Sequence, residues 1–341
     1  MTSPRRDISP ALAICGLALV LVAAVIAGIG SGAVSVAPGD VIASIVRGLS
    51  GRAQGMADTL IWQVRLPRVV LAALVGAALA GAGVIYQALF RNPLADPYIL
   101  GISSGAGLGA VIALTLTAQA TALRYGLVPA AAFVGALATM FLVVKLASWR
   151  GRLDAISLLL AGVAVSYTLS ALTSFLQVFA REQMASVVFW MMGGLGSASW
   201  PYVAMIAPMF LVGAALALAS TRELNLMLLG DERAGQLGVD VSRFTYFALT
   251  VASLLTAAAV AVAGLIGFVG LMVPHMVRLT LGPDHRSLLP ASLLGGATVL
   301  VLADLVARTV MAPVEIPVGI VTAVVGGPFF VWLLVSGGRS R

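Results

Sequence analysis

Charged residues are scarce in this 341-residue sequence: they make up 10% of the chain, whereas 60% of the residues are hydrophobic. The mean hydropathy of +1.07 excludes an ordinary soluble domain of this length. Apolar runs of roughly 20 residues, the length that a helix needs to cross a hydrocarbon core about 30 Å thick, recur along the chain. We therefore expect an all-α membrane protein, because a membrane β-barrel would show short alternating segments instead.

Residues that carry catalytic or redox chemistry are also few. Cys15 is the sole cysteine, which excludes a disulfide within the chain. His275 and His285 are ten residues apart and so make no metal-ligand pair at helical spacing. Lys145, the sole lysine, is not part of a GxxxxGK[ST] phosphate loop, and no HExxH motif occurs. The sequence predicts no enzyme activity and no metal or cofactor bound by this chain.

The net charge is +7, but the basic residues are scattered at the ends of apolar runs rather than clustered. Orientation rules place basic residues at such positions, so we expect no nucleic-acid partner.

Ten apolar runs predict ten transmembrane spans. Their expected ranges are 11–32, 69–90, 98–116, 125–147, 156–179, 202–219, 244–262, 266–281, 288–311 and 318–335. Only residues 263–265 separate the seventh span from the eighth. Between the fifth and sixth, residues 180–200 predict a short interfacial helix.

The first run follows Arg5 and Arg6 and so also resembles a signal peptide. Because Ala11 to Ile29 is longer than a usual signal h-region, we favour a retained first span. Ten spans place both termini on one side. With the N-terminus inside, 13 of the 20 basic residues lie on the cytoplasmic side, as the positive-inside rule expects.

One polar stretch, TRELNLMLLGDERAGQLGVDVSR at residues 221–243, carries seven charged residues. Each would cost about 2.5–3.5 kcal/mol at the middle of a bilayer, so we place the stretch in the cytoplasm. Two interpretations remain open: a docking surface for a partner, or a solvated connector between two spans.

Within this stretch the spacing predicts two short helices. Apolar pairs at helical spacing are Leu224 with Leu228 and Ala234 with Leu237. Gly230 is expected to end the first helix, Asp231 to cap the second and Gly238 to close it.

A polar stripe runs along the fifth span, at Tyr167, Ser170, Ser174 and Gln177, with steps of three, four and three residues. Such a face either lines a water-filled path or makes hydrogen bonds to neighbouring spans. In the third span Gly101, Gly105 and Gly109 share a face. Small residues at this spacing allow helices to approach closely, and we favour internal packing over a subunit interface.

On the outer side, Arg65, Arg68 and Arg308 are the basic groups nearest the ends of the spans. They either receive acidic groups of an outer partner or are solvated or bound to lipid headgroups. Asp304 and Arg308 are four residues apart and are expected to pair across one helical turn. Spans one to eight have no acidic residue near their middle, where an ion-driven carrier usually needs one. We infer that another protein supplies the energy for transport; an ion-driven secondary transporter and a structural membrane protein are the alternatives.

Several blocks in order between about residue 60 and residue 335 resemble the FecCD permeases, the membrane subunits of type II ATP-binding-cassette importers. The first is RLPRVVLAALVGAALAGAGVIYQALFRNPLADPYILGISSGAG at 65–107. Others are LLGDERAGQLGVDV at 228–241, GLIGFVGLMVPHMVRLTLGPDHRSLLP at 264–290 and EIPVGIVTAVVGGPFFVWLL at 315–334.

The resemblance implies a homodimer of ten-span subunits in the bacterial inner membrane. Two cytoplasmic ABC ATPase subunits would bind ATP and Mg and would grip residues 221–240. The coupling residues would be Leu228, Gly230, Asp231, Glu232, Arg233, Ala234, Leu237 and Gly238. A periplasmic substrate-binding protein would dock on Arg65, Arg68 and Arg308. The fifth span would line the translocation path, and its inner gate would fall on Asp154, Ala155, Ile156 and Ser157. The substrate would be an iron complex, either haem or a ferric siderophore, with cobalamin as the alternative.

Overall fold

The computed structural model describes residues 9–32, 36–51, 54–117, 121–149 and 153–337. Among these residues all regular structure is helical. The longer helices are α1 (Pro10–Gly30), α4 (Leu66–Leu89), α5 (Ile102–Leu116), α6 (Thr121–Ala147), α7 (Ala155–Phe179), α9 (Trp200–Ala219), α12 (Val241–Ala263), α13 (Val269–Leu281), α14 (His285–Thr309) and α15 (Val318–Gly337). The shorter ones are α2 (Pro38–Leu49), α3 (Gly55–Leu60), the π-helical turn η1 (Ile61–Arg65), the 3-10 turn η2 (Arg181–Gln183), α8 (Met184–Met191), α10 (Thr221–Met227) and α11 (Asp231–Gln236).

Each of the ten predicted spans coincides with one of the longer helices. Seven described helices, counting residues 55–89 as one, are long and apolar enough to cross a membrane; α5, α13 and α15 are apolar but shorter. The predicted division between the seventh and eighth spans is confirmed, because α12 ends at Ala263 and α13 begins at Val269. Helix α8 confirms the short helix expected within residues 180–200.

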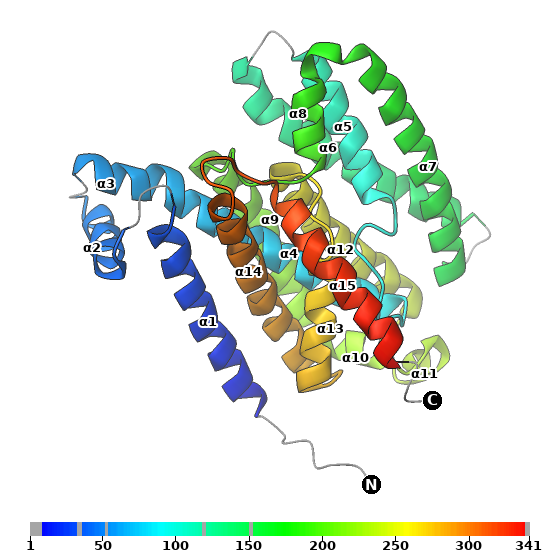
Figure 1. Ribbon diagram of the computed structural model, residues 1–341. Helices are drawn as coiled ribbons and strands as arrows, with labels where there is room; N and C mark the ends of the chain where they lie inside the picture. The colour runs from blue at the N-terminus through cyan, green and yellow to red at the C-terminus, as the bar shows by residue number, and fades with distance from the viewer. Residues whose placement is uncertain (1–8, 33–35, 52–53, 118–120, 150–152, 338–341) are drawn as a thin grey trace.

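Helix α10 and helix α11 lie at one end of the bundle, where α1 begins and α15 ends (Figure 1). We call this the inner end and the opposite one the outer end, following the topology predicted from the basic residues. The shared position of these four elements agrees with the prediction that both termini lie on the side of the polar stretch.

The centre of the fold is a close pair formed by α4 and α14. Gly76 on α4 and Gly296 on α14 face each other so closely that a Cβ atom on either would overlap the carbonyl group of the other. Gly83 makes the same kind of approach to Gly270 on α13. Small residues give helices in a membrane the backbone proximity on which van der Waals packing depends, so these glycines bring α4, α13 and α14 together.

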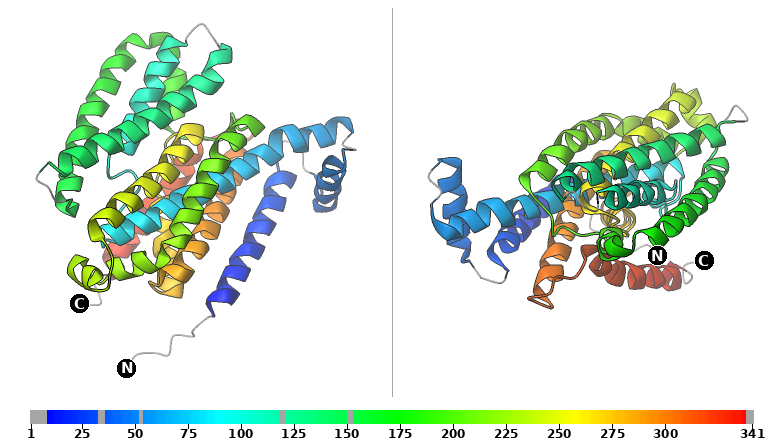
Figure 2. Two further views of the ribbon diagram at one scale, coloured as in Figure 1. Left: turned by 180° about the vertical axis from the view of Figure 1, so that it is seen from behind. Right: turned by 90° about the horizontal axis from the view of Figure 1, so that it is seen from above.

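Helices α5 to α8 form a separate group beside this centre, and the opposite views of Figures 1 and 2 agree on this. The group joins the rest of the bundle largely through α12, which packs against α5 and α6. Gly105 and Gly109 face Gly135, Thr139 and Ala131 on α6. The interpretation of the glycine stripe as internal packing is therefore confirmed.

Candidate coupling and docking sites

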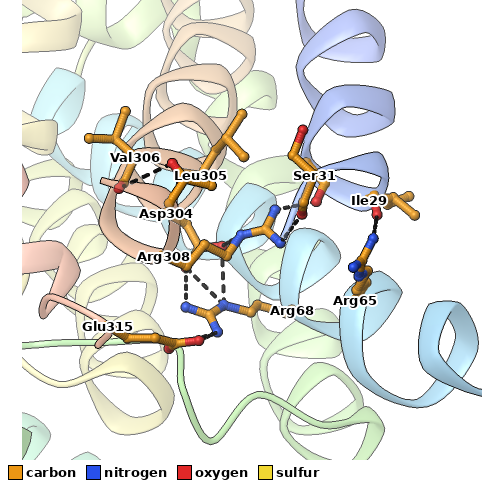
Figure 3. Close-up of polar contacts among 11 residues, drawn as sticks. Ile29, Ser31, Arg65, Arg68, Asp304, Leu305, Val306, Arg308 and Glu315 are labelled. Atoms are coloured by element: carbon orange, nitrogen blue, oxygen red, sulfur yellow. Dashed lines mark hydrogen bonds and ion pairs between the residues drawn. The ribbon is translucent and has the colours of Figure 1, made fainter. Parts of the chain in front are cut away.

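Arg68, at the outer end of α4, lies between two carboxylates from distant parts of the sequence (Figure 3). Its Nε donates to the Asp304 carboxylate at 2.9 and 3.2 Å, and its Nη1 donates to both oxygens of Glu315 at 2.9 Å. Asp304 belongs to α14 and is 1% exposed, whereas Glu315, in the loop before α15, is half exposed. Charge-assisted bonds of this kind are the stronger class of hydrogen bond, so Arg68 ties α4 to α14 and to the loop that leads into α15.

The other two candidate docking arginines bind the end of α1. Arg65 donates to Ile29 and Gly30 at 2.8 and 3.1 Å, and Arg308 donates to Ser31 at 2.7 Å and to Gly28. All four acceptors are backbone carbonyl oxygens. The last carbonyls of a helix lack intrahelical donors and carry partial negative charge, so two guanidinium groups satisfy the C-terminus of α1.

Burial distinguishes these arginines from solvated surface groups: Arg65 is 5% exposed and Arg308 is 9% exposed. The predicted pairing of Asp304 with Arg308 is confirmed at 3.4 Å. Docking on Arg65, Arg68 and Arg308 stays a prediction, and in this structure all three are engaged within the chain. Sequence reasoning missed the role of Glu315, because nothing in the sequence places it beside a residue 247 positions away.

At the inner end, the stretch 221–243 forms the two predicted helices, α10 and α11. Gly230 has φ of +98° and occupies the N-cap position of α11. The prediction that Asp231 caps this helix is wrong: Asp231 is the first helical residue, and its carboxylate instead accepts from Arg91, at the end of α4, at 3.0 Å. A cap needs extended backbone, and here the glycine supplies the turn that comes before the helix.

Gly238 closes α11 as predicted. Its φ is +90°, its amide donates to Gly235, and the amide of Val239 donates to Ala234 at 3.0 Å. These two bonds are the Schellman arrangement that usually requires glycine after a helix. The second helix of the stretch is thus ended by a specific motif and is not an incidental turn.

In each predicted apolar pair, one residue is buried and the other is exposed to solvent. Leu224 and Ala234 are fully buried, whereas Leu228 and Leu237 are 39% and 53% exposed. Glu232, Arg233 and Gly238 are exposed around them. A hollow of about 340 Å³ lies beside Leu237, between the start of α10 and the start of α12, and charged side chains rim it. Exposed leucines with charged neighbours are typical of a surface that a protein partner covers.

The predicted polar stripe on α7 lies largely on the surface of the chain. Tyr167, Ser170 and Ser174 are exposed, and Gln177 is half-buried, with its Nε2 donating to the Met191 sulfur at 3.3 Å. The Ser170 hydroxyl lies 3.4 Å from that of Ser104 on α5. The stripe therefore faces outward along most of its length. Its use as a path stays a prediction.

The predicted inner gate forms the start of α7. The Asp154 carboxylate caps the helix by accepting from the Ser157 amide at 2.9 Å and from its hydroxyl at 2.7 Å. These bonds stabilise the charged form and lower the pKa of Asp154. Ala155 is the first helical residue, and the next side chain, Ile156, is 70% exposed. The apolar Ile156 is thus presented by a rigid, capped helix end.

A cavity of about 530 Å³ lies between the α5–α8 group and the central helices. Aromatic side chains line much of it, at Tyr125, Phe189, Trp190 and Tyr202, and Arg68 and Glu315 border it. No sequence pattern indicated this cavity, because its walls come from six separate parts of the chain.

Residues 19–336 match the FecCD transport family. This chain belongs to the FecCD transport family. It is an ABC transporter permease with several membrane-spanning helices, as the resemblance of its sequence blocks predicted.

Three relatives show the breadth of the FecCD family. The chain is 50% identical over 82% of its length to the cobalamin import system permease protein of Halobacterium salinarum, of which the match covers 74%. It is 44% identical to the hemin transport system permease protein of Yersinia pestis, over 82% of this chain and 85% of the relative. It is 42% identical to the Fe(3+) dicitrate transport system permease protein of Escherichia coli, over 81% of this chain and 85% of the relative.

The fold of this FecCD-family chain also matches a solved metal-chelate type ABC transporter in an inward-facing conformation. The TM-score is 0.83 at 33% identity, and the match covers 95% of this chain and 98% of that one. The helix arrangement described above is therefore that of an ABC transporter permease.

Proposed function

We propose that this chain is the membrane subunit of an ATP-driven importer, with ten spans, both termini in the cytoplasm and a location in the inner membrane. One observation carries the proposal: α10, α11 and the turns that follow them expose charged residues and leucines at one end of a bundle whose long helices are apolar. Two separate ABC ATPase subunits are expected to bind this surface. ATP and its Mg ion belong to those subunits, and this chain contributes no catalytic residue.

Chain continuity supports transmission of movement from the ATPases. A single residue, Ser220, separates α9 from α10, and residues 237–240 separate α11 from α12. An ATPase dimer that closes on ATP would displace α10 and α11 and, with them, the ends of α9 and α12. The helices α9 and α12 would then have two packing arrangements, one that opens the path to the outside and one that opens it to the cytoplasm. ATP binding would shift the population from one arrangement to the other.

We further propose that the importer is a homodimer with the path between its two copies. Helix α7 is only 17% buried over its most apolar window, although its stripe carries Tyr167, Ser170 and Ser174. Lipid cannot hydrogen-bond these hydroxyl groups, so a second copy and a water-filled path are a better environment for them. In the view from above, α7 (green) and α15 (red) lie at adjacent edges of the molecule (Figure 2), and the second copy is proposed to pack on this side. Ile156 and the capped start of α7 would form the inner gate.

The substrate is proposed to be a bulky metal chelate. Haem and ferric siderophores are the first candidates, and the hemin and ferric dicitrate relatives support them. Cobalamin is the second candidate, favoured by the 50% identity to the cobalamin permease. Because a binding protein would deliver the chelate from outside, the path itself would not have to bind the chelate tightly.

The experiment is reconstitution of the chain with its ATPase and binding protein in liposomes, with haem, ferric siderophores and cobalamin tested in turn. The substrate is the chelate that stimulates ATP hydrolysis and accumulates in an ATP-dependent manner. The double substitution Asp231→Ala and Arg233→Ala is expected to abolish import. Thr245→Ala, which removes a hydroxyl bonded only to its own helix, is the matched control. Import by the chain alone under an ion gradient would contradict the proposal and support a secondary transporter.

A further inference from the structure

Besides the ion pair of Arg91 with Asp231, a compact set of bonds holds the coupling helices to the bundle. Asn225, in the middle of α10, donates from its amide Nδ2 to Oδ1 of Asp284 at 2.7 Å. Its Oδ1 accepts from the backbone amide of His285 at 2.9 Å and lies 2.8 Å from Nδ1 of the same histidine. We call these three residues the α10–α14 junction.

The chemistry of the junction fixes the orientation of the Asn225 amide. Its oxygen must face the His285 backbone N–H, which can only donate, and its NH₂ group must face a carboxylate, which accepts. The His285 ring then carries its proton on Nδ1. Asp284 is also the N-cap of α14 and accepts from the Arg286 amide at 3.0 Å. These bonds lower the pKa of Asp284 and keep it charged. One side chain of α10 is therefore bonded to the first turn of α14 at three points.

The junction is connected to the outer end of the molecule through α14, which runs from His285 to Thr309. His285 is 1% exposed, so the first turn of α14 cannot move without moving its surroundings. On α13, Arg278 donates to Gln87 of α4 at 2.8 Å, which joins the neighbouring helix ends. Beyond the first turn, α14 packs on α4 through Gly296. Its last turns carry Asp304 and Arg308, which with Arg65, Arg68 and Glu315 form a group at the outer end that we call the outer cluster.

We propose that Asn225 is the positioning residue that transmits movement of the coupling helices to α14, and through α14 to the outer cluster. This inference rests on the proposed function of the chain as an ATP-driven permease. Apolar side chains of α10 and α11 pack on the bundle, at Leu224, Met227 and Ala234. Among the described residues, two polar contacts also join these helices to the bundle, and they differ in kind. The Arg91–Asp231 pair is exposed on both sides and is therefore weak. The junction has a buried histidine and three directed bonds, so it is the contact able to carry a displacement.

The test exchanges the amide of Asn225 and the carboxylate of Asp284 between the two positions. Asn225→Asp places a second carboxylate against Asp284, and like charges at hydrogen-bond distance repel. Adding Asp284→Asn restores one amide facing one carboxylate. In the wild type Oδ1 of Asp284 accepts from both Asn225 and the Arg286 amide, so the new asparagine must turn its amide group to donate to residue 225 and accept from Arg286. The measured quantity is the number of ATP molecules hydrolysed per chelate imported by the reconstituted complex. Thr280→Ala, which removes a hydroxyl that binds only its own helix, is the control on the same face.

We expect Asn225→Asp to raise the ATP-to-import ratio about tenfold, within the range of typical coupling between sites. ATPase subunits should remain bound, and the double variant should return towards the wild-type ratio. If Asn225→Asp does not assemble, Asn225→Ala, which adds no charge, provides the same readout. An unchanged ratio, with import falling only as the amount of folded protein falls, would overturn the inference. Failure of the wild-type chain to bind an ATPase would instead overturn the proposed function.

Discussion

At the outer end of the α4–α14 pair, Arg68, Arg308 and Asp304 are largely buried and bind more than one partner each. At the inner end, Arg91 at the end of α4 makes one exposed ion pair, with Asp231. Arg68 binds two carboxylates and is 11% exposed; Arg91 binds only Asp231 among the described ion pairs, and both side chains are at least 44% exposed. Buried charges depend on their partners far more than exposed ones do. The outer cluster thus fixes the helices relative to one another, and the inner surface is left free to bind and release.

The largest effect is expected from removing the shared carboxylate of the outer cluster. Asp304→Ala leaves Arg68 and Arg308 without their common buried partner, which should cost about 3–5 kcal/mol of stability. Thermal unfolding of the purified chain in detergent measures the loss. A midpoint equal to that of the wild-type chain would show that the cluster does not hold the outer end together.

A smaller loss of stability is expected when α4 and α14 are forced apart at the middle of their contact. Gly296→Ala puts a methyl group into the backbone of α4 at Gly76, and overpacking of this kind typically costs about 1–3 kcal/mol. The matched control is Gly126→Ala on α6, where the added Cβ meets no atom within 4 Å. Similar unfolding midpoints for the two variants would mean that α4 and α14 are not closely packed.

Glu315 offers a test of docking on the outer cluster, because its carboxylate occupies Arg68 and would compete with a carboxylate of the binding protein. If a binding protein docks by placing its own carboxylate on Arg68, it must displace the half-exposed Glu315. Glu315→Gln should therefore raise the affinity for the binding protein a few-fold, most clearly at low salt. Glu182→Gln, a substitution of another exposed glutamate on the outer side, is the control. Weaker binding by Glu315→Gln alone would argue that docking uses the glutamate itself.

The smallest effect on stability is expected at the inner end. Arg91→Ala removes one exposed ion pair and should change the free energy of unfolding by less than about 1 kcal/mol. The same detergent unfolding assay applies. If Arg91→Ala lowered the stability as much as Asp304→Ala does, the charged groups at the two ends would contribute equally to stability, against the comparison made above.

Much of the fold was predictable because helix length and hydropathy are local properties. All ten expected ranges contain a helix, and Gly238 ends α11 as predicted. Gly230 was expected to end α10, but α10 ends at Met227 and Gly230 is the N-cap of α11. The cap of α11 was predicted wrongly because Asp231 suits an N-cap by type, and only the position of Arg91 shows where its carboxylate goes. The burial of Arg65 and Arg308 was equally out of reach, since their acceptors are backbone carbonyls of α1, which have no signature in the sequence.

By itself the sequence determined that the protein is helical and lies in a membrane, where its long apolar helices fall, which short stretch must stay in water and, through its motif blocks, its family. These features can be read from the sequence because burying an unpaired charge or backbone group in lipid costs free energy. A membrane-spanning helix must therefore be a run of about 20 apolar residues, which is a local pattern. The sequence predicted the local pair of Asp304 with Arg308, but only the tertiary structure decided which polar groups from distant parts of the chain meet. Arg68 with Glu315 and Asn225 with Asp284 are brought together by helices that cross the whole bundle, and contacts between residues so far apart depend on packing rather than on local pattern.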